Sequence, residues 1–209
     1  MVGKIRVKLI LGSTRQGRFG EKPANWLYNE IKRDWSDSID IELLDLRDYQ
    51  MPFFDDPIPP SQHKGEYKNQ AVGKWAEKIR ESDAFIIVTP EYNHGYPGAL
   101  KNAMDWIYKE WNNKPVGFVS YGSALGARAI EQMRSVAVAL QMAPIRNALH
   151  IPSDVYANAS AASDQAAVAS AFGPIRKGPM GDRVAGFMDQ LLWWAMALKS
   201  AREGSSQAN

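Results

Sequence analysis

Residues 4–25 read KIRVKLILGSTRQGRFGEKPAN, and the rest of the chain repeats the pattern that they introduce. The apolar run Ile5–Leu11 ends abruptly at Gly12, and a glycine- and arginine-containing loop follows before a helical pattern begins. A short apolar run bounded by turn residues is typical of a buried strand. The stretch therefore predicts a strand, a loop and the N-terminus of a helix, in that order.

The loop of residues 12–20 carries groups that suit a phosphate monoester. Backbone N–H groups at a helix N-terminus favour an anion, and the helix macrodipole adds to that preference. Ser13 supplies a hydroxyl, and Arg15 and Arg18 supply charge-assisted donors. The loop has neither the GxGxxG nor the GxxxxGK[ST] spacing of the common nucleotide motifs. An ordinary strand-to-helix connection with two solvated arginines is the alternative interpretation.

Composition narrows the class of protein. The chain has 209 residues, of which 45% are hydrophobic and 23% charged, so it is long enough for one domain with a substantial core. A net charge of +2 without a basic stripe argues against a nucleic-acid partner. There is no cysteine, no signal-peptide layout and no apolar run of membrane-spanning length. We expect a single domain spanning residues 1–209, located in the cytoplasm and not in a membrane.

Apolar runs and helical patterns alternate five times along the chain, which predicts an α/β fold with a parallel sheet and helices on both faces. The third run, 84–89, is apolar throughout, as in strands buried on both sides. Four prolines within residues 49–60 predict an ordered loop. The expected strands are 5–11, 39–44, 84–89, 115–121 and 145–151, and the expected helices are 23–35, 66–81, 98–111, 124–142 and 183–202.

The C-terminal third is harder to assign. Residues 153–182 are rich in Ala, Ser, Gly and Pro, and we expect an irregular excursion there with one helical turn at 166–171. Asp182 is predicted to cap the final helix. Its Trp193, Trp194 and Met196 are expected in the core, and residues 203–209 are expected to form a frayed tail.

Ligands of parallel sheets bind at the carboxyl ends of the strands, which singles out the loops 12–20, 90–97 and 121–126. The second loop lies within the stretch TPEYNHGYPGALKNAMDW, residues 89–106. It offers backbone groups, a tyrosine ring and an asparagine amide to a flat heterocycle. A plain strand-to-helix loop with an exposed tyrosine is the alternative. His94 in this loop suits a substrate contact or a solvated side chain equally well.

Together the two motifs, GSTR…R at 12–18 and TPEYN…G…PGALKNA…DW at 89–106, resemble the NADPH-dependent FMN reductase family of flavodoxin-like proteins. The resemblance covers roughly residues 4–150 and the last helix, and it implies the strand order 2-1-3-4-5. It implies that Ser13, Arg15 and Arg18 hold the FMN phosphate, with Gly20 in the same loop where many relatives have a serine. The isoalloxazine would then be lined by Pro90, Glu91, Tyr92, Asn93 and Gly95. In the third cofactor-binding loop of the family, Ser120, Gly122 and Ser123 match best.

The resemblance implies an oxidoreductase that passes hydride from NADPH or NADH through FMN to a small-molecule acceptor: a quinone, an azo compound, free flavin or a metal oxyanion. Because the flavin carries the redox chemistry, no side chain is named as a catalytic acid or base, and no metal is expected. Arg128 could attract the NADPH phosphate, but an ordinary surface arginine is the better interpretation.

The same resemblance implies a homodimer, or a dimer of dimers, with the flavin near the interface. Residues 52–59 and 98–111 are rich in apolar side chains, and we interpret Trp106, Ile107, Tyr108 and Trp111 as too many to face one core. Two other functions stay open: an electron carrier like flavodoxin, which the slightly basic charge disfavours, and a flavin-free regulatory module on the same fold.

Overall fold

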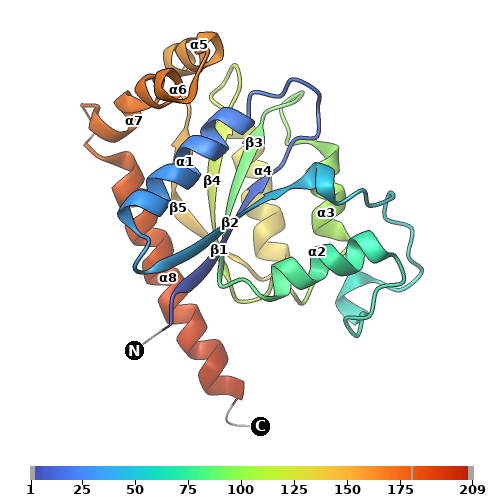
Figure 1. The fold of residues 1–209 in the computed structure, drawn as a ribbon. Helices are drawn as coiled ribbons and strands as arrows, with labels where there is room; N and C mark the ends of the chain where they lie inside the picture. The colour runs from blue at the N-terminus through green and yellow to red at the C-terminus, as the bar shows by residue number, and fades with distance from the viewer. Residues whose placement is uncertain (1–2, 180, 207–209) are drawn as a thin grey trace.

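The computed structural model describes residues 3–179 and 181–206. At its centre lies a parallel five-stranded sheet in the order β2-β1-β3-β4-β5 (Figure 1), which confirms the predicted fold class and strand order. All seven residues of β3 and of β4 are buried, as the apolar runs predict. The strands are β1 (Ile5–Leu11), β2 (Ile39–Asp45), β3 (Ala84–Pro90), β4 (Pro115–Tyr121) and β5 (Ala143–His150).

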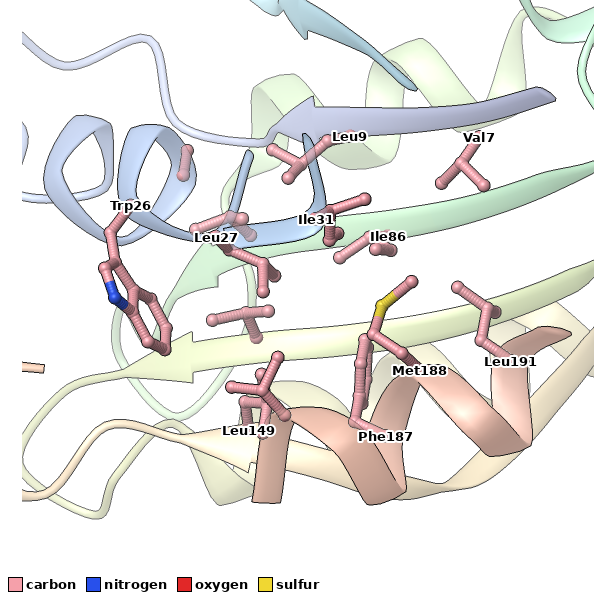
Figure 2. Close-up of a cluster of buried hydrophobic side chains, with 14 of the residues drawn as sticks. Val7, Leu9, Trp26, Leu27, Ile31, Ile86, Leu149, Phe187, Met188 and Leu191 are labelled. Carbon is pink, nitrogen blue, oxygen red and sulfur yellow. The ribbon is translucent and has the colours of Figure 1, made fainter. Parts of the chain in front are cut away.

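Helices cover both faces of the sheet. On one face α1 (Glu21–Asp34) and α8 (Arg183–Ser206) share a buried cluster with β1 and β3, and Figure 2 shows Trp26 and Leu27 of α1 and Phe187 and Met188 of α8 within it. On the other face α2 (Gln70–Arg80), α3 (Gly98–Asp105) and α4 (Ala127–Ala139) share a second cluster. The carboxyl ends of all five strands therefore meet at one edge, between the two layers.

The helix predicted over 98–111 ends at Asp105, and the remaining residues fold back as turns. This corrects our reason for expecting a dimer, because Trp106, Ile107 and Trp111 are all buried in the second cluster of the same chain. The indole N–H of Trp106 donates to the Pro52 carbonyl at 2.8 Å and ties the proline-rich loop to α3. Within that loop Phe53 is 86% exposed, and a 3-10 turn follows at Pro60–Gln62.

The stretch 153–182 is mostly helical, which corrects the expectation of an irregular excursion. It forms α5 (Ser153–Ala161), α6 (Gln165–Ala171) and α7 (Gly173–Lys177), which lie beside α1 in Figure 1. Phe172 stacks on Trp26 of α1 with 4.6 Å between ring centroids. Lys22 of α1 donates to the carbonyl of Ala159 at 2.6 Å, at the end of α5. Docking on α1, rather than any amphipathic pattern of its own, orders this segment.

The last helix confirms its predicted cap but not its predicted buried face. Asp182 accepts a hydrogen bond from the Ala185 N–H at 2.9 Å. Trp193, Trp194 and Met196 are 62%, 37% and 52% exposed, because the face that packs on the sheet is another one. That face carries Val184, Phe187, Met188, Leu191 and Ala195. The helix also continues through Ser206, so 203–206 are not a frayed tail, and 207–209 lie outside the described residues.

No helix in the described parts of the chain is long and apolar enough to cross a membrane. Within the same residues, no group of three or more His, Cys, Asp or Glu side chains is arranged to hold a metal ion.

Candidate active site

A cavity of about 330 Å³ lies where the loops after β1, β3 and β4 meet the start of α5. Larger hollows on the surface have fewer of the predicted residues, so this cavity is the candidate site. It is lined by Arg15, Phe19, Pro90, Glu91, Tyr92, Tyr121, Gly122, Ser123, Ser153 and Tyr156. Thus the fold brings together Arg15, Pro90, Glu91, Tyr92, Gly122 and Ser123 of the predicted set.

Arg18 supports the first loop from behind. Its side chain is 1% exposed, and its guanidinium forms a two-pronged pair with Asp45 at the end of β2 and donates to the Ser13 carbonyl. Burial alone would raise the pKa of Asp45, but the hydrogen bonds from Arg18 lower it, so the carboxylate stays charged. Arg18 therefore fixes the path of the loop, and its guanidinium is turned away from the cavity.

Arg15 is the cation of this loop that faces outward. Its side chain is exposed, with one long contact of 3.4 Å to the Gly17 carbonyl. Arg47, after β2, donates to the carbonyls of Thr14 and Arg15 at 3.3 and 2.6 Å and thereby braces the loop. Sequence analysis missed Arg47; the adjacency of β1 and β2 is the signal that places it here.

The second loop is a tight turn closed by two hydrogen bonds between Tyr92 and Gly95, at 2.8 and 3.0 Å. Its central residues Asn93 and His94 have φ angles of 49° and 69°, the left-handed conformation that such two-residue turns require. The Tyr92 hydroxyl lies 2.9 Å from the Ser13 Oγ, so the turn is joined to the phosphate-loop candidate. Asn93 and Gly95 shape the turn without lining the cavity.

Helix α4 holds this turn from the other side. The Glu91 side chain is 3% exposed, and its carboxylate accepts from the Arg128 Nε at 2.6 Å and from the Arg128 backbone N–H at 3.2 Å. Arg128 also lies 2.9 Å from the His94 Nε2, and Gln132 donates to the His94 carbonyl at 3.0 Å. Both arms of the turn are therefore anchored to α4, and the Arg128 guanidinium is engaged by Glu91 and His94 of the same chain.

Ser120, near the end of β4, is fully buried. Its hydroxyl donates to the Leu125 carbonyl at 2.7 Å, across the third loop, and lies 3.0 Å from the His150 Nδ1. It closes the loop and does not line the cavity. Gly122 has a φ of 146°, and a Cβ there would lie 3.1 Å from the Glu91 Cβ. Only glycine combines that backbone conformation with so close an approach of the two loops.

An aromatic wall was missed by the sequence analysis. The Phe19 ring lies 4.2 Å from Tyr156 of α5 and 5.0 Å from Tyr121 at the end of β4, measured between centroids. Ser153 lines the cavity beside them. Tyr121 directly precedes a predicted site residue and was within reach of sequence reasoning, whereas α5 comes to the site only through its docking on α1.

The model of the NADPH-dependent FMN reductase family matches residues 5–155, the stretch that contains all three loops. The chain belongs to this family. Family members are oxidoreductases that use NAD(P)H and FMN. The match ends one residue before Tyr156, so most of α5 and everything after it lie outside the family match.

Among the relatives of this chain, an NAD(P)H-dependent FMN reductase of Schizosaccharomyces pombe is 38% identical over 151 residues, covering 71% of this chain and 74% of that protein. A quinone reductase of Escherichia coli is 33% identical over 146 residues, which cover 67% of this chain and 73% of that protein. The solved structure of the flavoenzyme NAD(P)H:(acceptor) oxidoreductase FerB from Paracoccus denitrificans has a TM-score of 0.62 and 22% identity, covering 90% and 97% of the two chains. That structure shares the fold.

Two observations of the structure indicate that the residues around this cavity fit FMN. The cavity has an exposed arginine at one end and aromatic rings along its walls, which suits an anionic, flat molecule. Beside it, the Tyr121 hydroxyl is completely buried and has no hydrogen-bond partner among the described residues. Because buried polar groups are nearly always paired, an unpaired hydroxyl at a cavity wall points to a polar ligand.

Proposed function

We propose that this family member passes electrons from NADPH or NADH through FMN to small oxidised acceptors, with quinones as the first class. The observation that carries the proposal is the convergence of three loops on one cavity, with Arg15 at one end and Tyr92 against Ser13. The similarity to the quinone reductase of Escherichia coli supports the choice of quinones. Azo compounds, free flavin and metal oxyanions are further candidate acceptors. The proposed location is the cytoplasm, and the proposed unit is one domain spanning residues 1–209.

The proposed roles follow the geometry. Arg15 and the backbone N–H of Glu21 at the start of α1 bind the cofactor phosphate, since no side chain caps that helix, the Lys22 N–H already donates to the Phe19 carbonyl and Pro23 has no N–H. Pro90, Tyr92, Gly122 and Ser123 line the ring system. Glu91 lines the cavity and, through its pair with Arg128, holds the turn in place. The remaining predicted residues build the walls from behind, and these are Ser13, Arg18, Gly20, Asn93, Gly95 and Ser120.

When bound, FMN supplies the transfer of hydride between the nicotinamide and the acceptor. The protein binds and orients the reactants and keeps water from the ring. No side chain is assigned the transfer of a proton, because Glu91 is held in its pair with Arg128 and Ser120 in its bonds to Leu125 and His150.

Anaerobic reduction tests the function. We expect the protein to bind FMN, and we expect NADPH or NADH to bleach the yellow complex, with colour returning when a quinone is added. Absorbance at the flavin bands follows both steps. A protein that takes up FMN but is not bleached by either nicotinamide would be an electron carrier, and a protein that takes up no FMN would be a module without flavin.

We also propose that the protein is a homodimer, or a dimer of dimers, in contact near the site. Phe53, Phe54 and Ile58 are 86%, 37% and 46% exposed in the loop beside the phosphate-loop candidate, and an exposed apolar cluster of this kind favours a protein partner. Sedimentation at micromolar concentration should give twice, or four times, the 23.3 kDa of one chain. A single species of 23.3 kDa would contradict the proposal.

A further inference from the structure

The Tyr121 side chain ends in the most unusual polar atom of the site. The residue is 6% exposed, and its hydroxyl is shielded from solvent with no hydrogen-bond partner among residues 3–179 and 181–206. Burial raises the pKa of this phenol, so the hydroxyl keeps its proton. The Gly20 N–H lies close enough to favour the phenolate slightly but without the alignment of a hydrogen bond. Even a hydrogen bond from Gly20 would leave the hydroxyl hydrogen without an acceptor.

The hydroxyl lies at the N-terminus of α1. Gly20 precedes the first residue of α1, and a Cβ built on Gly20 would lie 2.7 Å from the Tyr121 hydroxyl and 3.0 Å from a methyl group of Leu11. The phenol of β4 therefore occupies the space of a side chain at residue 20. No side chain caps α1, so its first turn lacks a side-chain acceptor. The Glu21 carboxylate in that turn is paired with Arg18 at 3.0 Å and with Arg47 at 3.0 Å, which offsets its negative charge.

Two aromatic contacts hold the phenol in this position. Phe19 meets it edge-on at 5.0 Å between ring centroids, and the Tyr156 ring of α5 lies 6.3 Å away with its plane inclined at 27°. Lys22 fixes α5 in turn through the carbonyls of Ala159, Ser160 and Ala162. A donor that is packed on both sides, protonated and unpaired is ready to meet an acceptor without further cost in side-chain entropy.

We propose that the Tyr121 hydroxyl donates a hydrogen bond to the phosphate of the bound cofactor and replaces the hydroxyl that a serine at position 20 would supply. The inference rests on the proposed function, because it assigns the phosphate to the first turn of α1. It adds β4 to the phosphate site and gives α5 a role, since Tyr156 packs on the phenol from beyond the family match.

Titration with two ligands separates this inference from the function itself. FMN and riboflavin share the ring and differ in the phosphate, and quenching of their fluorescence reports binding without turnover. We expect the Tyr121→Phe protein to bind FMN about tenfold more weakly than wild type, the size of one hydrogen bond to a charged acceptor, and to bind riboflavin unchanged. Tyr67→Phe is the matched control, because it removes a tyrosine hydroxyl from a partly buried residue that contacts Glu110 on the opposite face of the sheet.

A second variant tests the exchange of positions. With the phenol oxygen removed, the nearest ring carbon would be 3.4 Å from a Cβ at residue 20, which is ordinary contact. A methyl group of Leu11 stays 3.0 Å from that Cβ and must shift by a few tenths of an ångström, which the end of a flexible side chain can do. We therefore expect Gly20→Ser to restore FMN affinity in the Tyr121→Phe background and to weaken it in wild type. Unchanged FMN affinity in Tyr121→Phe, or equal loss for both ligands, would overturn the inference alone. A wild-type protein that binds neither ligand would overturn the proposed function and the inference with it.

Discussion

The Asp83→Ala protein should lose about 3 kcal/mol of unfolding free energy at pH 7, the range measured when one partner of a buried ion pair is removed. Asp83 precedes β3, and its side chain is 3% exposed. The carboxylate accepts from the backbone N–H of Arg6 at 3.0 Å, from Lys199 at 3.0 Å and from Arg202 at 3.2 Å. One side chain thus joins β1 and β3 to the end of α8. Denaturant unfolding measures the loss, and hydrogen exchange should show faster exchange in the last turns of α8.

The stability difference between wild type and Asp83→Ala should also depend on pH. Burial alone would raise the pKa of Asp83, but the hydrogen bonds from Arg6 and Lys199 lower it below its ordinary value of about 3.9. A carboxylate with a lowered native pKa stabilises the fold fully above the unfolded pKa, and the contribution is lost as pH falls through the native pKa. The stability difference between wild type and Asp83→Ala should therefore persist from pH 7 to about 4 and shrink below it.

The control for this effect is Asp37→Ala, which removes an exposed carboxylate and should change stability by less than about 0.5 kcal/mol. Equal unfolding midpoints for Asp83→Ala and wild type at pH 7 would contradict the prediction. So would a difference that stays constant down to pH 2.

The second large effect is expected for Arg128→Met. Without Arg128 the Glu91 carboxylate, 3% exposed, keeps only a backbone N–H. Breaking a buried pair is costly, but the Arg128 side chain is 42% exposed and water can partly replace it, so we expect a loss of about 2 kcal/mol. Because the pair anchors the Tyr92–Gly95 turn, FMN affinity should also fall by about tenfold. Denaturant unfolding and flavin titration measure the two effects.

Three further variants separate positioning from general damage. Arg128→Lys keeps the charge but loses the planar guanidinium, whose Nε and Nη2 both contact Glu91 Oε1, so its stability and FMN affinity should fall between those of wild type and Arg128→Met. Arg134→Met, on the same helix, removes hydrogen bonds to the carbonyls of β5 and should cost stability without weakening FMN binding. Adding Glu91→Gln to Arg128→Met should recover part of the loss, since the uncompensated charge is gone. If Arg134→Met weakened FMN binding as much as Arg128→Met, the anchoring role would be refuted.

Charge pairing beneath the site fixes the orientation of two charged residues of the predicted set, of which Arg18 does not line the cavity and Glu91 does. From sequence, Arg18 and Glu91 are the polar residues of two ligand loops, and both belong to the motifs of the family. In the fold each meets an opposite charge from a distant segment, Arg18 at Asp45 and Glu91 at Arg128. A loop motif identifies which residues matter, but only the neighbouring elements decide which way a long side chain turns.

Helix ends and helix faces were also beyond local reasoning. The 98–111 pattern is apolar enough for a longer helix, yet the chain turns after Asp105. In the turned chain the Trp106 indole N–H donates to the Pro52 carbonyl and the Trp111 side chain is buried in the core. The final helix is apolar on several sides, so the sequence does not choose between Phe187 and Trp193 as the buried face. Gly117 of β4 chooses it, because it leaves room for the Phe187 ring.

The sequence by itself determined the five strands, their order through the family resemblance, and the three loops at the ligand edge, because buried strands and turn residues are written in local patterns. The tertiary structure decided the walls of the site. Phe19, Tyr121 and Tyr156 come from three elements far apart in the chain, and the hydroxyl beside Gly20 arrives from β4. Contacts of this kind depend on how layers pack around the sheet, and no local spacing encodes them.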